Sequence, residues 1–270
     1  MVHCCLTWML AVALMLAPAA EPDAKPAKVQ GTQWCRLPDG RAALLVHFAV
    51  QPGWHMYWTN PGDSGGPPVA KATLPDGWKL GTPIWPRPTV LKHDEEVLFV
   101  HEGAWSWLVP VEGPTPDALP TSSFELRVSW MVCKEACEIG KASLQVVPPS
   151  APLQAAPAKG GAGSFPEKPG AGDSVMFADG GLHLRFDARG QSSARFLQAT
   201  NPGVQVNGSN PVPARISEGK ALLDAPLQVR SEDALGQELA VSGLLLFGDA
   251  PGDPCVWIRQ SVSTPARSTP

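Results

Sequence analysis

Alternating hydrophobic and polar residues mark the clearest secondary-structure element of the chain, over residues 124–132. A period of two residues is typical of a β-strand with one buried face and one open face. Further apolar segments predict strands over 42–50, 54–58, 105–111 and 142–147. The apolar members of the first pattern are Phe124, Leu126, Val128, Trp130 and Val132, and the residues between them are Glu125, Arg127, Ser129 and Met131.

Turn residues separate these segments, and no part of this half of the chain shows helical periodicity. Many short strands joined by tight turns are typical of a β-sandwich. Beyond residue 173 the alternation is weaker, but 182–186, parts of 221–229 and the apolar run 239–247 predict a second, smaller β-sandwich. The predicted fold class is therefore all-β. The turn signals are Asp39-Gly40, Pro52-Gly53, Asp76-Gly77 and Glu102-Gly103.

A change in composition predicts where the domains end. Residues 149–172 are rich in Pro, Ala and Gly and offer almost nothing to bury, which is typical of a linker. Eight of the ten Trp lie between Trp34 and Trp130, and only Trp257 lies beyond this segment. We therefore predict domains over 30–148 and 173–262, followed by a disordered tail over 263–270.

The first residues have the pattern of a secretion signal. An apolar run over 6–16 precedes the small residues of 17–19, and the run is too short for a comfortable membrane span. We predict a signal peptide over 1–19, although its only positive charges are His3 and the amino terminus, and an uncleaved anchor is the alternative. No later segment could cross a bilayer, so we expect a mature chain without a membrane span, periplasmic or secreted.

Composition and charge exclude several functional classes. Apolar residues make up 44% of the chain, charged residues only 17%, and the formal net charge is -4 with no run of Lys or Arg. Nucleic-acid binding needs a basic face, so we predict none. The chain also lacks the serine-hydrolase, zinc-protease and phosphate-loop motifs. We predict no cofactor.

The cysteines carry the candidate chemistry. Cys4 and Cys5 lie in the signal segment, which leaves four cysteines in an oxidising compartment where disulfides form. Cys133 and Cys137 follow directly on the strand 124–132, and its parity places Cys133 on the open face with Met131. Three intervening residues allow the roughly 4.4–6.8 Å between Cα atoms that a disulfide needs.

Three interpretations of this pair remain open at the level of spacing. An exposed pair at a strand end suits disulfide exchange, because access and thiolate fraction set its rate. The same pair could be a structural staple, or could bind Cu(I) through its thiolates. The other two cysteines, Cys35 and Cys255, form either a long-range structural disulfide that joins the two domains or two buried free thiols. Additional copper ligands would be His55, Met56, His101 and Met131.

Several motifs resemble one known family. Residues 53–65, Gly-Trp-His-Met-Tyr-Trp-Thr-Asn-Pro-Gly-Asp-Ser-Gly, resemble a segment of the N-terminal periplasmic domain of DsbD-type thiol:disulfide interchange proteins, the ScsB-like branch above all. The resemblance continues through Trp85-Pro86 and 101–111 and ends in 128–137, Val-Ser-Trp-Met-Val-Cys-Lys-Glu-Ala-Cys. It covers most of 30–148. The second domain is similar, more vaguely, to the extra β-domain of ScsB-like proteins.

This resemblance implies an immunoglobulin-like domain that exchanges disulfides without a thioredoxin-type C-x-x-C motif. Cys133 and Cys137 match the exchanging pair, and Cys137 matches the sulfur that joins the partner. The implied partners are a thioredoxin-like or membrane-embedded redox protein and oxidised periplasmic proteins. Relatives continue into a membrane domain and a thioredoxin-like domain, so we expect the electron donor of this chain to be a separate polypeptide.

The family also covers its cysteines with a cap loop. The matching region is about 92–99, an acidic stretch that could equally be a solvated turn. One departure is His101, which stands where relatives often have Tyr. The predicted cap-loop residues are Asp94, Glu95, Glu96 and Phe99, and the predicted neighbours of the thiols are Trp54, His55, Tyr57, His101 and Met131.

Overall fold

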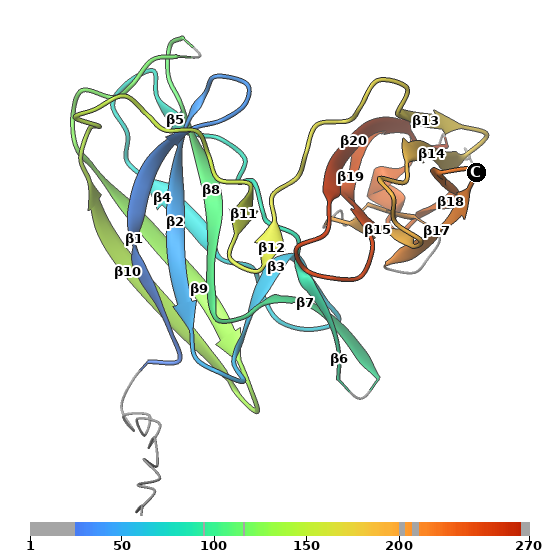
Figure 1. The fold of residues 1–270 in the computed structure, drawn as a ribbon, viewed down its shortest axis with the longest axis horizontal. Coiled ribbons are helices and arrows are strands. Elements are labelled where there is room, and N and C mark those ends of the chain that lie inside the picture. The colour runs from blue at the N-terminus through green and yellow to red at the C-terminus, as the bar shows by residue number, and fades with distance from the viewer. Residues whose placement is uncertain (1–24, 94, 116, 200–202, 207–210, 266–270) are drawn as a thin grey trace, which may run out of the picture.

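The structure, a computed structural model, describes residues 25–265 apart from residues 94, 116, 200–202 and 207–210. They form two β-domains that lie side by side (Figure 1). Within this part of the chain the helical content is a single 3-10 turn, η1 (Glu232–Ala234), and no helix there is long and apolar enough to cross a membrane. The all-β prediction is confirmed, and the predicted signal peptide lies outside the described residues.

The first domain is a sandwich of two antiparallel sheets. The strand order is β1-β2-β8-β5 in one sheet and β10-β9-β3-β7-β6 in the other, where β4 also pairs with β9. The first sheet comprises β1 (Ala27–Arg36), β2 (Ala42–Val50), β8 (Ala104–Glu112) and β5 (Lys79–Leu80). The second comprises β10 (Cys137–Val146), β9 (Phe124–Cys133), β3 (His55–Gly62), β7 (Glu96–His101), β6 (Thr89–His93) and β4 (Val69–Ala72).

The core of this domain follows from the alternation in the sequence. Every apolar residue of the 124–132 pattern is buried, whereas Glu125, Arg127 and Ser129 face the other side. Aromatic rings from the opposite sheet fill the space between: Phe48 stacks on Trp105 at 4.7 Å between ring centroids and meets Trp130 edge-on at 6.0 Å. Such pairs contribute beyond their buried area.

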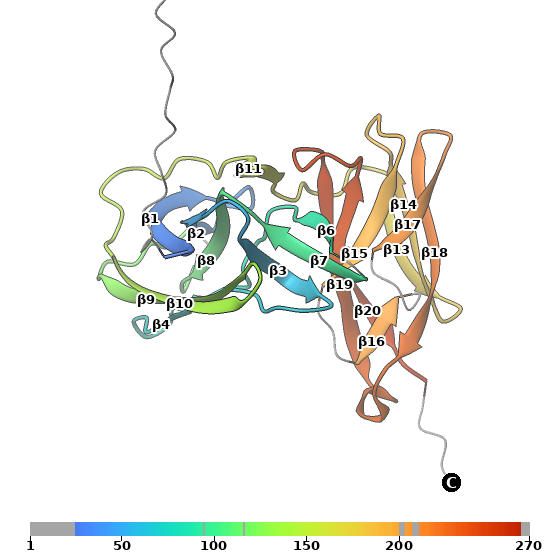
Figure 2. The same cartoon turned by 90° about the horizontal axis from the view of Figure 1, so that it is seen from below.

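The second domain is an eight-stranded antiparallel sheet that curls around its own core. The order is β13-β14-β18-β17-β15-β19-β20, with β16 paired to β18. Side chains of β14 and β18 pack in one buried cluster with side chains of β15, β19 and β20, so the sheet closes into two layers (Figure 2). The strands are β13 (Ser174–Ala178), β14 (Gly181–Asp187), β15 (Ala194–Gln198), β16 (Val204–Val206), β17 (Val212–Ser217), β18 (Lys220–Val229), β19 (Glu238–Phe247) and β20 (Cys255–Ser263).

The segment predicted as a linker is packed rather than free. It contains a short hairpin of β11 (Lys159–Gly160) and β12 (Gly163–Ser164), and Phe165 is buried in a cluster with residues of the first domain. A Cβ at Gly163 would lie 2.2 Å from the Arg87 carbonyl oxygen, so glycine permits the close approach of two backbones. Low apolar content did not prevent packing, because this segment is held largely through its backbone.

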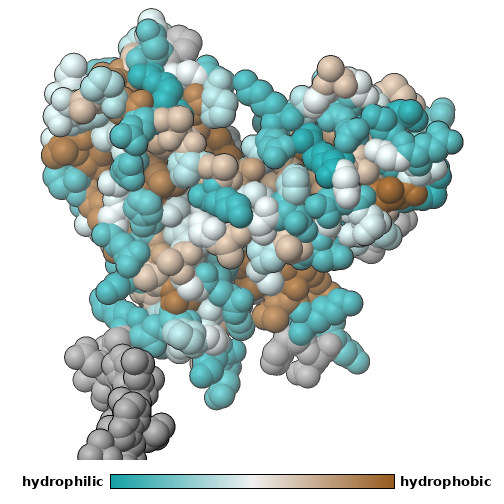
Figure 3. All heavy atoms as spheres, viewed as in Figure 1, coloured by the Kyte–Doolittle hydropathy of each residue, from teal (hydrophilic) through white to brown (hydrophobic). Residues whose placement is uncertain are grey.

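The two domains share one hydrophobic cluster. Leu197, Leu244 and Leu246 of the second domain belong to the cluster that also contains Trp58 and Phe99 of the first. In the space-filling view the two lobes touch along their lower halves and separate toward the top (Figure 3). A shared apolar core of this kind favours a fixed arrangement of the domains over independent motion.

The first residues of the predicted disordered tail belong to the second domain. Ser263 is the last residue of β20, and Thr264 is buried, where its hydroxyl donates to the carbonyl oxygens of Ala234 and, at 3.1 Å, Gln237. The polar composition of the tail does not predict these contacts, because they form with residues about thirty positions earlier. Residues 266–270 lie outside the described residues.

Candidate functional site: the Cys133–Cys137 disulfide

Cys133 and Cys137 form a disulfide at the tip of the β9–β10 hairpin. They are direct partners in the antiparallel register, with Cα atoms 4.1 Å apart and sulfurs 2.02 Å apart. The loop Lys134–Ala136 between them is closed by the backbone hydrogen bond from Lys134 N–H to Ala136 O at 3.1 Å. The alternation that defines β9 thus continues to its last residue and sets the first sulfur opposite the second.

The two sulfurs differ in exposure. Cys137 lies on β10, an edge strand, and is exposed, whereas Cys133 is only 6% exposed. Cys133 lies between β10 and β3, where His55 is its register partner. The prediction that the face carrying Cys133 is open is therefore wrong at this end of the strand, because another element covers it.

The cover is the hairpin of β6 and β7, together with Tyr57 of β3. Cys133, Tyr57, Leu98 and Val100 form one buried cluster, and Leu91 and Met131 pack against it. The apolar run over 97–100 alternates in space: Leu98 and Val100 face the disulfide side, and Phe99 faces the main core. An external thiol that approaches along this side meets side chains before it meets the sulfur of Cys133.

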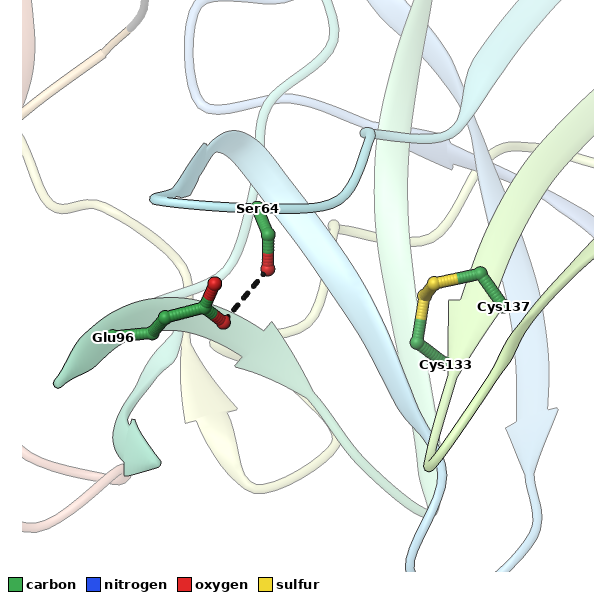
Figure 4. The surroundings of a disulfide bond; sticks show 4 residues. All are labelled: Ser64, Glu96, Cys133 and Cys137. Carbon is green, nitrogen blue, oxygen red and sulfur yellow. Dashed lines mark hydrogen bonds between the residues drawn. A yellow bond between two sulfur atoms is a disulfide. The ribbon is translucent and has the colours of Figure 1, made fainter. Parts of the chain in front are cut away.

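A short segment of the 53–65 motif fastens the tip of this hairpin. Asp63 N–H donates to Val97 O at 3.1 Å, and Val97 N–H donates to the Asp63 carboxylate at 2.7 Å. The Ser64 hydroxyl donates to Glu96 Oε2 at 3.1 Å, beside the disulfide (Figure 4). Gly65 has a φ of +97° and lies against the Tyr57 ring, where a Cβ would come within 2.3 Å. The Asp-Ser-Gly sequence therefore serves to dock the hairpin.

The predicted cap loop is thus a β-hairpin with a tight turn. Register continues up to the pair His93 and Glu96, and Glu95 is exposed in the turn, whereas Asp94 lies outside the described residues. Phe99 does not cover the disulfide. It is 1% exposed and meets Trp58 edge-on at 6.4 Å on the opposite face of the hairpin. Single-strand alternation, which separates neighbouring residues onto opposite faces, accounts for this difference.

Some of the predicted neighbours lie beside the disulfide in the structure, and others lie away from it. Tyr57 and Met131 lie in the cluster around Cys133, and His55 is the register partner of Cys133, with Nε2 3.1 Å from Glu102 Oε1. Burial, and secondarily the Glu96 carboxylate, raises the pKa of the Tyr57 hydroxyl. Trp54, by contrast, packs against the main core.

His101 also lies away from the thiols. It is 5% exposed, and its ring stacks on Trp105 at 4.1 Å and on Trp85 at 6.4 Å between centroids. Burial lowers its pKa to about 3, so the imidazole is neutral at ordinary pH. Because Val100 faces the disulfide, the next residue of the strand faces the core.

The copper alternative finds no convergent ligand set around the disulfide. Of the histidines considered as ligands, His55 is engaged by Glu102 and His101 is enclosed by tryptophan. Among the residues that the structure describes, no group of three or more His, Cys, Asp and Glu side chains could hold a metal ion. Of the candidate ligands, His55 and Met131 lie beside Cys133, whereas His101 lies in the core, and copper binding stays a prediction.

The long-range disulfide between Cys35 and Cys255 does not form, and both residues are free and buried. Cys35 packs with Phe165, while the Cys255 thiol donates to the Ser164 carbonyl at 3.6 Å, so each thiol lies against the packed linker. Burial raises the pKa of each to about 11. Neither is a ready nucleophile, because the thiolate is the reactive form.

Sequence reasoning missed Leu98, Val100 and the fastening residues Asp63 and Ser64. The signal for the first two was the apolar run 97–100 next to an acidic turn, which predicts a strand. The hydrogen-bond partners of Asp63 and Ser64 lie more than thirty residues later in the sequence, where no local pattern indicates them.

Comparison with known proteins bears on this geometry. Residues 24–148 match the family model described as "Thiol:disulfide interchange protein DsbD, N-terminal". This segment is similar to the DsbD N-terminal domain. The match confirms the resemblance inferred from the motifs, and it covers slightly less than half of the chain. It ends at residue 148, two positions beyond β10.

A solved structure extends the likeness to the second domain. The N-terminal periplasmic domain of ScsB from Proteus mirabilis has a TM-score of 0.54 and 14% sequence identity, covering 91% of this chain and 97% of that one. At this identity the likeness concerns the fold, and it spans the DsbD-like domain together with the domain that follows. No curated protein matches the chain.

Proposed function

We propose that this chain is a periplasmic thiol–disulfide interchange protein that relays electrons from a dithiol redox protein to oxidised periplasmic proteins through Cys133 and Cys137. The observation that carries the proposal is the asymmetric disulfide, with Cys137 exposed on an edge strand and Cys133 covered. A purely structural staple needs no such access. The family match and the periplasmic origin of the ScsB domain support the same conclusion.

The exchange begins at the exposed sulfur. A thiolate of the reduced partner attacks Sγ of Cys137, the bond between Cys133 and Cys137 breaks, and Cys133 leaves with the electron pair and takes up a proton. The second thiolate of the partner then attacks its own sulfur in the mixed disulfide and releases Cys137. The partner ends as a disulfide and this chain as a dithiol, so two electrons have been transferred.

The second half of the cycle runs in the opposite sense. The Cys137 thiolate attacks a disulfide of an oxidised protein, and Cys133 then attacks Cys137 to release the reduced product and restore the disulfide. Cys133 is suited to this resolving role because it lies opposite Cys137 in the register and is shielded from outside disulfides. Its cover therefore suppresses dead-end adducts on the wrong sulfur.

Trapping the mixed disulfide tests this proposal. Cys133→Ala leaves Cys137 exposed with no resolving thiol, so we expect a stable adduct with oxidised glutathione. We also expect one with a thioredoxin-like protein whose second cysteine is replaced and whose first carries glutathione, which the Cys137 thiolate displaces. Cys137→Ala should form several-fold less adduct, because Cys133 is covered. Mass spectrometry of the intact protein quantifies both, and Cys35→Ala is the matched control for a buried thiol.

The reduction potential of the pair gives an independent check. An exchanging disulfide titrates within the range of redox partners, whereas structural disulfides of secreted proteins lie below about −300 mV. A value in the structural range, together with no adduct on either single variant, would contradict the proposal and leave a stapled interaction domain.

A further inference from the structure

The hairpin over the disulfide depends on packing at both of its faces. Within the described residues, β7 pairs with β3, whereas β6 is the edge of the sheet and pairs with β7 alone. A two-stranded ribbon is marginally stable in water without a surface to pack on. Its position over Cys133 is therefore set by its pairing with β3, by the hydrogen bonds with Asp63 and Ser64, and by whatever packs on its two faces.

One face packs on the exchange site. Leu91, Leu98 and Val100 of the hairpin lie in or against the cluster that contains Cys133 and Tyr57. This contact closes the site from the side of the first domain, and it would be lost if the hairpin moved outward.

The opposite face packs on the core that the two domains share. Val90, Val97 and Phe99 lie in or against the cluster shared between the domains. Phe99 meets Trp58 edge-on at 6.4 Å, and Trp58 in turn meets Trp257 of β20 at 6.5 Å between ring centroids. A chain of three aromatic rings therefore connects the second domain to the hairpin.

A hydrogen bond provides a second link between the domains, beside these rings. The Asn60 side-chain N–H donates to the Gln198 carbonyl oxygen at 2.8 Å, which ties the end of β3 to β15. The turned view shows β3, β6 and β7 on the side of the first domain that faces the second domain (Figure 2). The second domain thus backs the element that covers Cys133.

We propose that Trp257 is a positioning residue for disulfide exchange: through Trp58 and Phe99 it holds the β6–β7 hairpin against Cys133 and so directs incoming thiols to Cys137. The second domain is then a brace for the exchange site. This inference rests on the proposed function, but the movement of the hairpin is measurable whether or not the chain exchanges disulfides with other proteins.

The test compares full-length variants. In Trp257→Ala the aromatic contact is lost, and we expect faster amide hydrogen exchange over 97–101. We also expect reduced glutathione to reduce the disulfide about fivefold faster, because an aromatic pair contributes about 1 kcal/mol and that energy corresponds to this factor. The share of glutathione attached to Cys133 rather than Cys137 should rise. Trp257→Phe keeps a ring in place and should restore the pattern of the unmodified protein.

Two further variants separate positioning from general stability. Trp34→Ala removes another half-buried tryptophan, which packs on Phe124 at the far end of β9, and should leave the adduct distribution unchanged. Phe99→Leu weakens the contact with Trp58 from the side of the first domain. Because it leaves the second domain unaltered, it tests the proposal even if Trp257→Ala unfolds that domain. Phe99→Leu should shift adducts toward Cys133.

Distinct outcomes overturn the two proposals. Equal hydrogen exchange over 97–101 in Trp257→Ala and the unmodified protein, or equal effects of Trp34→Ala and Trp257→Ala on the adduct distribution, would dismiss the brace. Faster hydrogen exchange and glutathione reduction in Trp257→Ala, with no trapped protein partner in Cys133→Ala, would retain the brace and remove the relay function.

Discussion

At the scale of single residues, the most unusual group of the first domain is the buried imidazole of His101. Its Nε2 has no hydrogen-bond partner, and the Trp105 ring stacks on the imidazole. Charging it there would cost solvation without compensation, which is why its pKa is lowered to about 3. In the unfolded chain the same imidazole titrates near its ordinary value of 6.5.

This difference predicts a specific dependence of stability on pH. Between pH 6.5 and about 3 the unfolded chain binds a proton at His101 that the folded chain does not, so stability falls as the pH falls. We expect His101 to account for a loss of about 1.4 kcal/mol per pH unit in that window. Urea denaturation at pH 7.5 and 5.0 should show this loss in the unmodified protein and a smaller one in His101→Phe. An equal loss of stability between pH 7.5 and 5.0 in the two proteins would contradict this prediction.

At the scale of elements, the β6–β7 hairpin combines two functions on two faces. Alternation places Leu98 over Cys133 and Phe99 against Trp58, so one short strand both covers the disulfide and contacts the interdomain core. Two hydrogen bonds between Asp63 and Val97, one to the backbone and one to the carboxylate of Asp63, fix the register of its tip. Covering by side chains, unlike burial by a main-chain layer, can be changed one residue at a time.

Removal of the Leu98 side chain should therefore uncover Cys133. In Leu98→Ala we expect reduction by small thiols to be faster by about an order of magnitude, because access is one of the terms that set the exchange rate. Stability should fall by about 2–5 kcal/mol, as is typical for truncation of a buried leucine. Leu223→Ala, in the core of the second domain, is the control with similar destabilisation, and its reduction rate should not change. Similar rates for both variants would argue against a local cover.

At the scale of the whole molecule, one arginine joins the domains through the backbone. Arg87 is 2% exposed, and its guanidinium donates to the carbonyl oxygens of Phe247 and Gly248 at 2.6 Å each and of Pro254 at 3.2 Å. A planar fork with several donors matches this set of acceptors, which a lysine could not. With the shared hydrophobic cluster, it fixes the second domain behind the hairpin.

Loss of this arginine should loosen the domains. We expect Arg87→Met to lower the free energy of unfolding by at least about 3 kcal/mol, since each hydrogen bond to a charged group contributes about 1.5–3 kcal/mol and buried carbonyls are left unpaired. Arg87→Lys should recover only part of the loss. Urea unfolding followed by circular dichroism measures both. A change below about 0.5 kcal/mol in Arg87→Met, the range of ordinary surface substitutions, would contradict the proposed joint.

Much of the fold was predictable because strand periodicity is a local property. The alternation of β9 identified its buried face residue by residue, and the motifs over 53–65 and 128–137 identified the resemblance to the DsbD N-terminal domain and the cysteine pair. The linker, the tail and the hairpin were predicted less well. Each is held by contacts with residues distant in sequence, and composition alone does not report such contacts.

The sequence by itself determined that Cys133 ends an alternating strand and that three residues separate it from Cys137, which brings the pair within reach of a disulfide. Only the tertiary structure decided which sulfur is reachable and which is covered. That choice depends on the β6–β7 hairpin, some forty residues earlier in the chain, and on Trp257, more than a hundred residues later. Packing between segments so far apart is set by three-dimensional complementarity, which no local pattern encodes.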